Sequence, residues 1–174
     1  MLEALSLPYQ IIDGLEDFTF AANLKINVLH YISPTSGGNT WISGANSSHD
    51  NEFIIQYKPP LDYWIIAMNQ GDVYAFPNET TVEDLNWHHV AITREGTIAK
   101  LYIDGSERVF TAVSQFIPTI SPNGFITGQD QDELGGGFGE MEEDWAGDID
   151  NLRVYRRALS APEIQLLSQT DIRP

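Results

Sequence analysis

Residues 88–105 read HHVAITREGTIAKLYIDG, and this stretch decides the fold class. Two short runs rich in apolar and β-branched residues, 88–93 and 99–104, are separated by Arg94-Glu95-Gly96, which predicts two strands joined by a turn. The pair Asp104-Gly105 then predicts a tight hairpin into the next strand, because the turn type favoured there needs positive φ. Strands joined this closely pair antiparallel.

The same pattern of short strands separated by turns extends over most of the chain. Further strands are predicted at 18–26, 40–44, 52–57, 63–68, 72–76, 108–110, 124–127 and 148–155. Only residues 160–167 have a helical pattern, where Ser160 can cap the first turn and Glu163 completes an S-x-x-E capping box. About ten strands and one short C-terminal helix predict an all-β fold, an antiparallel β-sandwich.

The composition excludes several classes of function. The 174 residues include 25 Asp and Glu against 9 Lys and Arg, a formal net charge of −16, and no cysteine. The length fits a single domain over residues 1–174. Nucleic acid and anionic membrane surfaces are not expected partners, because both are bound through clustered basic residues. No run approaches the roughly 18 apolar residues of a membrane span. Without cysteine, disulfides, thiol catalysis and thiolate zinc sites are excluded.

The acidic residues are concentrated near the C-terminus. No Lys or Arg lies between Arg108 and Arg153, whereas this stretch contains Asp130, Asp132, Glu133, Glu140, Glu142, Glu143, Asp144, Asp148 and Asp150. Two unit charges about 4 Å apart interact by roughly 4 kcal/mol at an effective dielectric near 20. The carboxylates must therefore spread apart or share a cation.

Residues 128–140, GQDQDELGGGFGE, are the first candidate cation site. Asp130 and Asp132 alternate with Gln131, and the glycines let backbone carbonyls and Glu140 or Glu142 face the same point. Calcium takes roughly six to eight such oxygen ligands, whereas zinc and copper prefer the Cys and His that this segment lacks. The alternative is a solvated acidic loop.

A second acidic segment precedes the predicted strand at 52–57. Asp50 and Asn51 would supply one carboxylate and one amide oxygen at the entrance of that strand. The alternative is an ordinary turn, where Asp and Asn are common.

Six segments together resemble the pentraxins, a family within the laminin-G-like and concanavalin A-like domains. They are DNEFII at 50–55, WHHV at 87–90, LYIDG at 101–105, GQDQDELGGGF at 128–138, GDIDN at 147–151 and ALSAPEI at 158–164. Their order and approximate spacing hold from about residue 18 to residue 167. The resemblance implies a jelly-roll sandwich of the concanavalin A-like type, with a calcium site on one face through which ligands are held.

The resemblance also assigns calcium ligands by position. Asp50 and Asn51 match two side-chain ligands, and Asp130 matches a carboxylate that is Glu in the family. Gln131 matches a position that contributes its backbone carbonyl. Asp132 matches the carboxylate that can bridge two ions. The first calcium position is therefore expected to be intact.

The sequence departs from the family pattern in several places. Gly139 stands where the family has its next carboxylate, with Glu140 one place further on, and Glu142 stands at a family Gln. Leu24 and Ala91 occupy the places of the paired cysteines of the family. The family segment beyond the helix has no counterpart here, so an oligomer is possible but the ring-shaped pentamer is not assumed.

Aromatic and histidine side chains give further candidates. Tyr63 and Trp64, near the presumed site, and Trp145, in the acidic stretch, are candidate ligand-contacting residues, because an aromatic face packs well on the C–H face of a sugar. Adjacent His88 and His89 are not expected to share a metal ion, since neighbouring strand residues point to opposite faces.

The leading hypothesis is a calcium-dependent module that binds a glycan or another hydroxyl-bearing or anionic ligand and serves adhesion or substrate attachment. We expect it to work outside the cell or on its surface, as a domain of a larger secreted protein, and without enzymatic activity. One alternative is a structural laminin-G-like spacer in which calcium only rigidifies the loops. Another is a glycoside hydrolase, since Glu140 and Glu142 would share a face of an extended chain.

Overall fold

The computed structural model describes residues 4–27, 38–49, 52–58, 63–69, 72–76, 82, 84–131, 133–135 and 143–170, which form two antiparallel sheets. The six-stranded sheet has the order β1 (Leu5–Ser6), β10 (Phe125–Thr127), β3 (Asn39–Gly44), β4 (Phe53–Lys58), β5 (Tyr63–Met68) and β6 (Asp72–Phe76). The five-stranded sheet has the order β11 (Gly147–Tyr155), β2 (Phe18–Ile26), β7 (His88–Glu95), β8 (Ile98–Ile103) and β9 (Ser106–Ala112). The helices are η1 (Tyr9–Ile11) and α1 (Ala161–Thr170).

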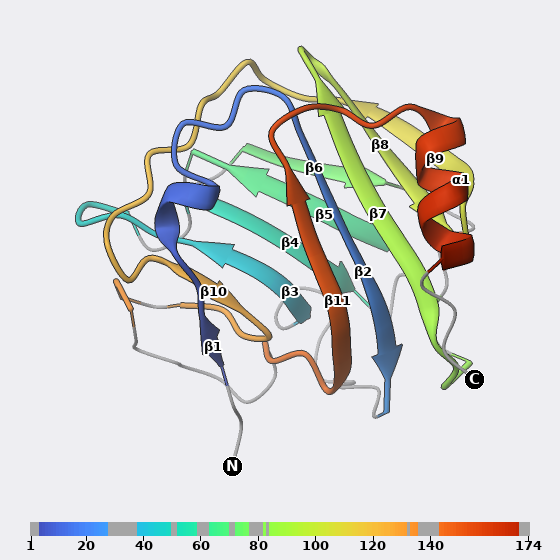
Figure 1. The fold of residues 1–174 in the computed structure, drawn as a ribbon. Coiled ribbons are helices and arrows are strands. Elements are labelled where there is room, and N and C mark those ends of the chain that lie inside the picture. The colour runs from blue at the N-terminus through green and yellow to red at the C-terminus, as the bar shows by residue number, and fades with distance from the viewer. Residues whose placement is uncertain are drawn as a thin grey trace.

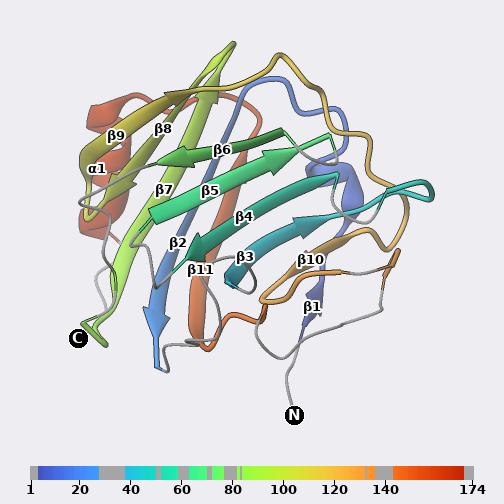
Figure 2. The same cartoon turned by 180° about the vertical axis from the view of Figure 1, so that it is seen from behind.

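The two sheets lie face to face. Figure 1 shows the five-stranded sheet in front of the six-stranded one, and Figure 2 shows the same pair from behind. Strands β3 to β6 and β7 to β9 neighbour each other in chain order, whereas other neighbours come from distant parts of the chain, such as β2 beside β11 and β3 beside β10. The architecture is the antiparallel jelly-roll β-sandwich that the sequence predicts.

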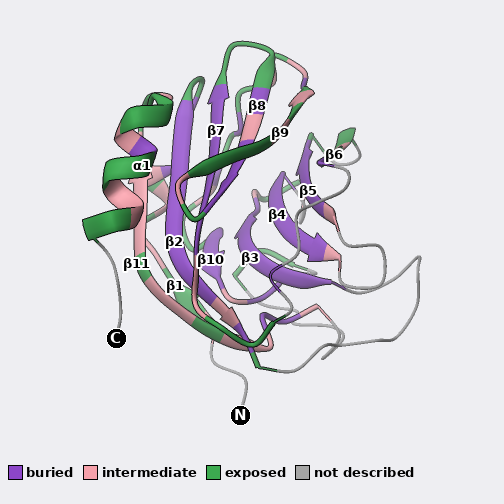
Figure 3. Ribbon diagram, turned by 90° about the vertical axis from the view of Figure 1, so that its right-hand side faces the viewer, coloured by how far each residue is buried: buried purple, intermediate pink, exposed green. Residues whose placement is uncertain are grey.

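Large aromatic side chains fill the space between the sheets. Phe20 of β2 and Phe53 of β4 are stacked with ring centroids 5.4 Å apart, so they join the two sheets directly. Trp41 and Trp64 meet edge to face at 6.2 Å, and both are completely buried. Offset and edge-to-face pairs of this kind stabilise a core beyond their burial alone. Figure 3 shows the buried residues concentrated on the strands that face this core.

The hairpin between β8 and β9 confirms the predicted turn. Asp104 and Gly105 have φ of 52° and 76°, the left-handed conformation that this turn requires at both positions. The Asp104 carboxylate also accepts a hydrogen bond from the backbone N–H of His89 at 3.0 Å. The turn is thereby held to the neighbouring strand β7.

Helix α1 packs on the outer face of the five-stranded sheet (Figure 1). The Glu163 carboxylate accepts hydrogen bonds from the Ser160 backbone N–H and hydroxyl, both at 2.8 Å, which satisfies the predicted capping interaction from the Glu side. Ile164 is completely buried in a small cluster with Ala21 and Tyr102. No described helix is long and apolar enough to cross a membrane.

A buried arginine holds the connection from β9 towards the six-stranded sheet. Arg94 is 2% exposed, and its guanidinium donates to the carbonyl oxygens of Gly96, Ser114 and Phe116 at 3.0, 3.0 and 2.6 Å. Further along, the backbone N–H of Thr119 donates to the Glu52 carboxylate at 3.0 Å. These contacts hold residues 113–124, the described segment between β9 and β10 that belongs to neither sheet.

The predicted strands at 18–26, 63–68 and 72–76 are confirmed with the same bounds. The other predicted strands are also present, with ends that differ by one or two residues, and the helix continues three residues beyond 167. The sequence analysis did not predict β1 or η1. A strand of two residues is too short to show alternation, so β1 depends on its pairing with β10.

Candidate functional site

The candidate site lies on the outer face of the six-stranded sheet, where strand alternation decides which side chains are present. Tyr57 and Trp64 are paired across β4 and β5, and both are completely buried between the sheets. Lys58 and Tyr63 form the next pair along these strands and therefore point to the outer face. Both are half-buried.

Two acidic segments are hydrogen-bonded to strand β3 and to each other. The Gly128 N–H donates to the Trp41 carbonyl at 3.1 Å, and the Trp145 N–H donates to the Gly128 carbonyl at 2.9 Å. The Glu143 carbonyl accepts from the Thr40 N–H at 3.2 Å. Segments 128–131 and 143–146 therefore meet beside β3, although about a dozen residues separate them in the sequence.

The Gln131 side chain fixes the first of these segments to β3. Its carboxamide nitrogen donates to the Ser43 hydroxyl at 3.1 Å and to the Gly124 carbonyl at 3.2 Å, and its oxygen accepts from the Gly135 N–H at 3.0 Å. The residue is completely buried. Because the side chain is fully used inside the protein, its backbone carbonyl is the group that remains for a metal ion.

Asp130 lies directly before this anchor. Its carboxylate accepts a hydrogen bond from the Gln131 N–H at 2.8 Å, and the residue is 8% exposed. A carboxylate and a backbone carbonyl are both oxygen donors, which fits calcium. These are the members of the predicted ligand set that the described residues contain.

Lys58 is a site residue that the sequence analysis missed. Burial lowers the pKa of its ammonium group, and the nearby carboxylates of Glu143 and Asp130 oppose that shift. Its side chain packs over Gly38, where a Cβ atom would lie 2.9 Å from both Cδ and Nζ. Lys58 thus supplies positive charge to an acidic part of the surface. The sequence feature that could have identified it is a lysine at the end of a strand of mostly apolar residues.

The other predicted ligands lie outside the described residues. These are Asp50, Asn51, Asp132, Glu140 and Glu142. Among the residues that the structure does describe, no cluster of three or more His, Asp or Glu side chains could hold a metal ion. Calcium binding therefore stays a prediction.

Glu52 fixes the start of β4, directly after the predicted ligands Asp50 and Asn51. Its carboxylate is buried, and it lies 3.2 Å from His49 Nδ1 as well as accepting the bond from Thr119. The start of β4 lies beside the end of β3, because Phe53 pairs with Gly44. Gln131 is bonded to Ser43, one residue away from that pair.

Two of the three candidate ligand-contacting aromatics are core residues. Trp64 is completely buried and Trp145 is 5% exposed, and their rings are stacked with centroids 6.1 Å apart. The Trp145 indole N–H donates to the Lys25 carbonyl at 3.2 Å. Neither ring presents a face on the outer side of the six-stranded sheet. Tyr63, half-buried beside Lys58, is the candidate that does reach that side.

His88 and His89 have separate environments. His88 lies between two carboxylates, with Nδ1 2.8 Å from Asp104 and Nε2 2.9 Å from Asp84. The Asp104 hydrogen bond, followed by that from Asp84, raises the pKa of His88 to about 9 against the opposing effect of burial. His89 is buried, 5% exposed, on the other side of the strand. The two rings do not form a shared metal site.

These features define a class: a lectin-like β-sandwich of two antiparallel sheets with an acidic segment on one outer face. The family described as the concanavalin A-like lectin/glucanases superfamily matches residues 3–165, and the chain belongs to this family. Within it, the chain is pentraxin-like, as the sequence resemblance predicts.

Three comparisons illustrate the similarity. C-reactive protein of Xenopus laevis is 28% identical over 71% of this chain and 51% of its own length. The Mus musculus sushi, von Willebrand factor type A, EGF and pentraxin domain-containing protein 1 is 30% identical over 93% of this chain and 4% of its own length. A heptameric SAP-like pentraxin from Limulus polyphemus shares the fold, with TM-score 0.72 and 24% identity over 97% of this chain and 75% of that one. The chain thus spans about half of the first relative and a small part of the second.

Proposed function

We propose that the chain is a calcium-dependent ligand-binding module, and that its ligand is a glycan. Calcium is held by Asp50, Asn51 and Asp130, by the backbone carbonyl of Gln131 and by Asp132. Glu140 and Glu142 are the candidates to complete the set of ligands. Hydroxyl or anionic groups of the ligand then occupy the remaining coordination positions.

One observation carries this proposal: the fully used Gln131 side chain anchors the acidic segment to β3, next to the start of β4. A solvated acidic loop would have no need of a buried anchor beside its carboxylate. The anchor orients Asp130 and the Gln131 carbonyl, and only Glu52 separates Asp50 and Asn51 from the start of β4 in the sequence. Orienting the donors before the ion arrives lowers the entropy lost on binding.

We propose that the module serves adhesion or substrate attachment as part of a larger protein. The mouse relative carries sushi, EGF and pentraxin domains in its name, and this chain corresponds to 4% of its length. We propose a single domain over residues 1–174 that works outside the cell or on its surface. The same observation favours the second candidate, a spacer domain whose loops calcium rigidifies.

We propose no catalytic role. The hydrolase alternative depends on Glu140 and Glu142 lying on one face of a strand, and both lie outside the described residues. The relatives with detectable sequence similarity that we compared are pentraxin-related proteins.

A thermal melt with and without 1 mM calcium tests the metal site. A ligand at 100 times its Kd adds about 2.7 kcal/mol, which raises the Tm by roughly 5–10 °C for a chain of this size. Asp130→Asn and Asp132→Ala should lose this increase. Glu95→Gln, which removes the same charge from an exposed residue of β7, should keep it. An unchanged wild-type Tm overturns the calcium assignment.

A glycan array in calcium, repeated with chelator, separates the module from the spacer. Signal in calcium that disappears in chelator and in Asp132→Ala supports calcium-bridged glycan binding. Signal that survives chelation contradicts the bridging role of calcium. A calcium-dependent Tm without any glycan signal favours the spacer.

A further inference from the structure

The sandwich has one open side, between β1 and β11. These are the outermost strands of the two sheets on that side, and within the described residues β1 pairs only with β10 and β11 only with β2. Figure 1 shows β1 and β10 to the left of β11. The sheets are not closed over each other here by any described strand.

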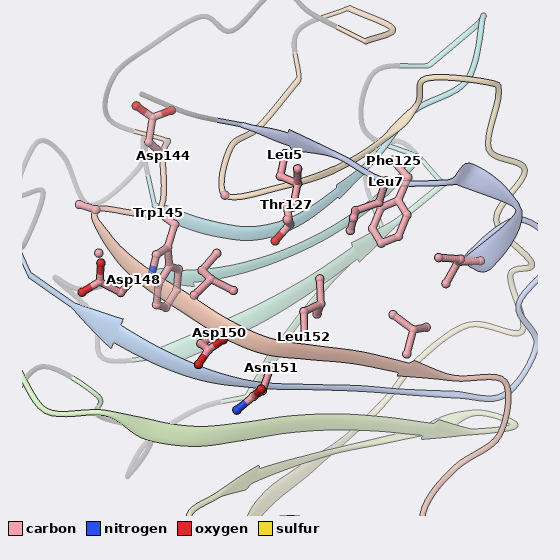
Figure 4. A pocket seen from close by; sticks show the side chains of 16 residues that line it. Leu5, Leu7, Phe125, Thr127, Asp144, Trp145, Asp148, Asp150, Asn151 and Leu152 are labelled. Atoms are coloured by element: carbon pink, nitrogen blue, oxygen red, sulfur yellow. The ribbon is translucent and has the colours of Figure 1, made fainter. Parts of the chain in front are cut away.

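A pocket of about 950 Å³ occupies this open side. Leu152 of β11 lies on one wall, while Leu7 and Phe125 lie on the opposite wall (Figure 4). Ile149 of β11 also lines the pocket. The Trp145 ring closes one end. Pockets of about 300–1,000 Å³ that are lined mainly by apolar side chains are typical binding sites for small molecules.

The inward side chains of β11 are incompletely buried. Ile149, Leu152 and Val154 pack against the central core, yet each is only half-buried, whereas eight of the nine residues of the adjacent β2 are buried. Leu5, on the other rim, is 59% exposed. An apolar ligand would remove this surface from water, which is the main source of binding free energy in such pockets.

The pocket differs in charge along its length. The lining contains three carboxylates, those of Asp144, Asp148 and Asp150. Asp144 and Asp148 lie with Trp145 at one end, and Leu7 and Phe125 lie at the other (Figure 4). Among the described residues of the lining, none is Lys, Arg or His. A carboxylate-bearing ligand would meet only like charge there, whereas an amine would meet opposite charge.

We infer that this pocket binds an elongated apolar molecule that carries an amine, with its apolar body between β11 and β10 and its ammonium group near Asp148. The pocket adjoins the acidic segments at Gly128 and Asp144, but its lining includes none of the proposed calcium ligands. Binding should therefore not require calcium.

Fluorescence in the presence of a chelator tests the inference without involving the calcium proposal. The neutral probe N-phenyl-1-naphthylamine should gain intensity with the wild-type protein. Decylamine below its micellar concentration should displace the probe at a concentration about tenfold lower than decanoate of equal chain length, because only the amine is attracted by the carboxylates. Equal displacement by both, or no gain of intensity, overturns the inference.

Matched variants locate the site. Leu152→Trp fills the pocket and should abolish the probe signal, whereas Phe110→Trp makes a similar change at an exposed position of β9, away from the pocket, and should retain it. If circular dichroism shows that Leu152→Trp is unfolded, Leu7→Trp replaces it in the experiment, because it fills the pocket from the opposite wall. Probe binding that persists in the folded pocket-filling variant contradicts the assignment.

Asp148→Asn tests the charge preference separately. The residue is exposed and its carboxylate accepts a hydrogen bond from the Asn27 amide at 3.0 Å, so the change should be tolerated. The neutral probe should bind as before, while the preference for decylamine over decanoate should fall severalfold. If the preference for decylamine over decanoate stays unchanged, the overall charge of the protein causes it. That result overturns the placement of the ammonium group near Asp148.

Discussion

The carboxamide of Gln131 donates a hydrogen bond to the hydroxyl of Ser43, 88 residues earlier in the chain, at 3.1 Å. This bond ties the acidic segment to the six-stranded sheet. Every polar atom of the Gln131 side chain has a partner, as expected for a completely buried amide. The position of the proposed calcium ligands therefore depends on a residue whose side chain is not itself a ligand.

Replacing Gln131 by Ala should destabilise the protein and weaken calcium binding together. The change leaves the buried Ser43 hydroxyl and Gly124 carbonyl without this partner, and also the more exposed Gly135 N–H, at a cost of about 3 kcal/mol. Urea unfolding in chelator measures the stability, and calorimetric titration measures the calcium affinity. Gln165→Ala, on the exposed face of α1, should change neither. A stable Gln131→Ala variant would show that the anchor is dispensable.

Arg94→Met should be one of the most destabilising single changes. Three carbonyl oxygens, those of Gly96, Ser114 and Phe116, lose their donor, and the guanidinium also leaves the Phe18 ring, 5.9 Å from it. We expect a loss of about 3–5 kcal/mol in the free energy of unfolding. Arg108→Met, at an exposed position of β9, serves as the control with a loss below about 0.5 kcal/mol. Similar losses in both variants would contradict this role of Arg94.

Lys58→Met should increase calcium affinity. The ammonium group lies near Asp130 and Glu143, so it repels a cation bound at Asp130. Removing it should tighten calcium binding by about five- to tenfold at low salt, with a smaller gain at high salt, because the repulsion is screened. Calorimetric titration measures the effect. Lys100→Met removes a lysine paired with Glu107 on the other sheet and should leave the affinity unchanged. Weaker calcium binding in Lys58→Met would refute the repulsion.

Most of the fold could be predicted because its signals are local. Apolar and polar residues alternate over short runs, which predicts the strands. Asp104-Gly105 specifies its own turn, because both residues tolerate the positive φ that this turn requires. The two-residue strand β1 has no such signal, because only its pairing with Ile126 and Thr127 of β10 defines it. Local signals suffice wherever a residue and its structural cause are close in sequence.

The candidate site was predicted less completely because its geometry depends on long-range register. Trp64 was a candidate for ligand contact, yet its place in β5 directs it into the core, while the next residue towards the turn, Tyr63, points outward. A one-residue difference decides between the two faces of a strand, and aromatic residues are common on either. The role of Lys58 likewise depends on residues more than 70 positions away, which no local pattern reveals.

The His88 cluster should make stability depend on pH on the alkaline side. The pKa of His88 is raised to about 9 in the folded protein from an ordinary value near 6.5, first by Asp104 and then by Asp84. The protonated imidazolium therefore stabilises the fold fully below about pH 6.5, and this contribution is lost as the pH rises to about 9. Because both carboxylates are about half exposed, we expect the loss to be only about 1–2 kcal/mol. Urea unfolding at pH 6 and pH 9.5 measures it. His88→Gln should show a smaller difference between the two pH values, and an equal difference in both proteins would mean that other groups cause it.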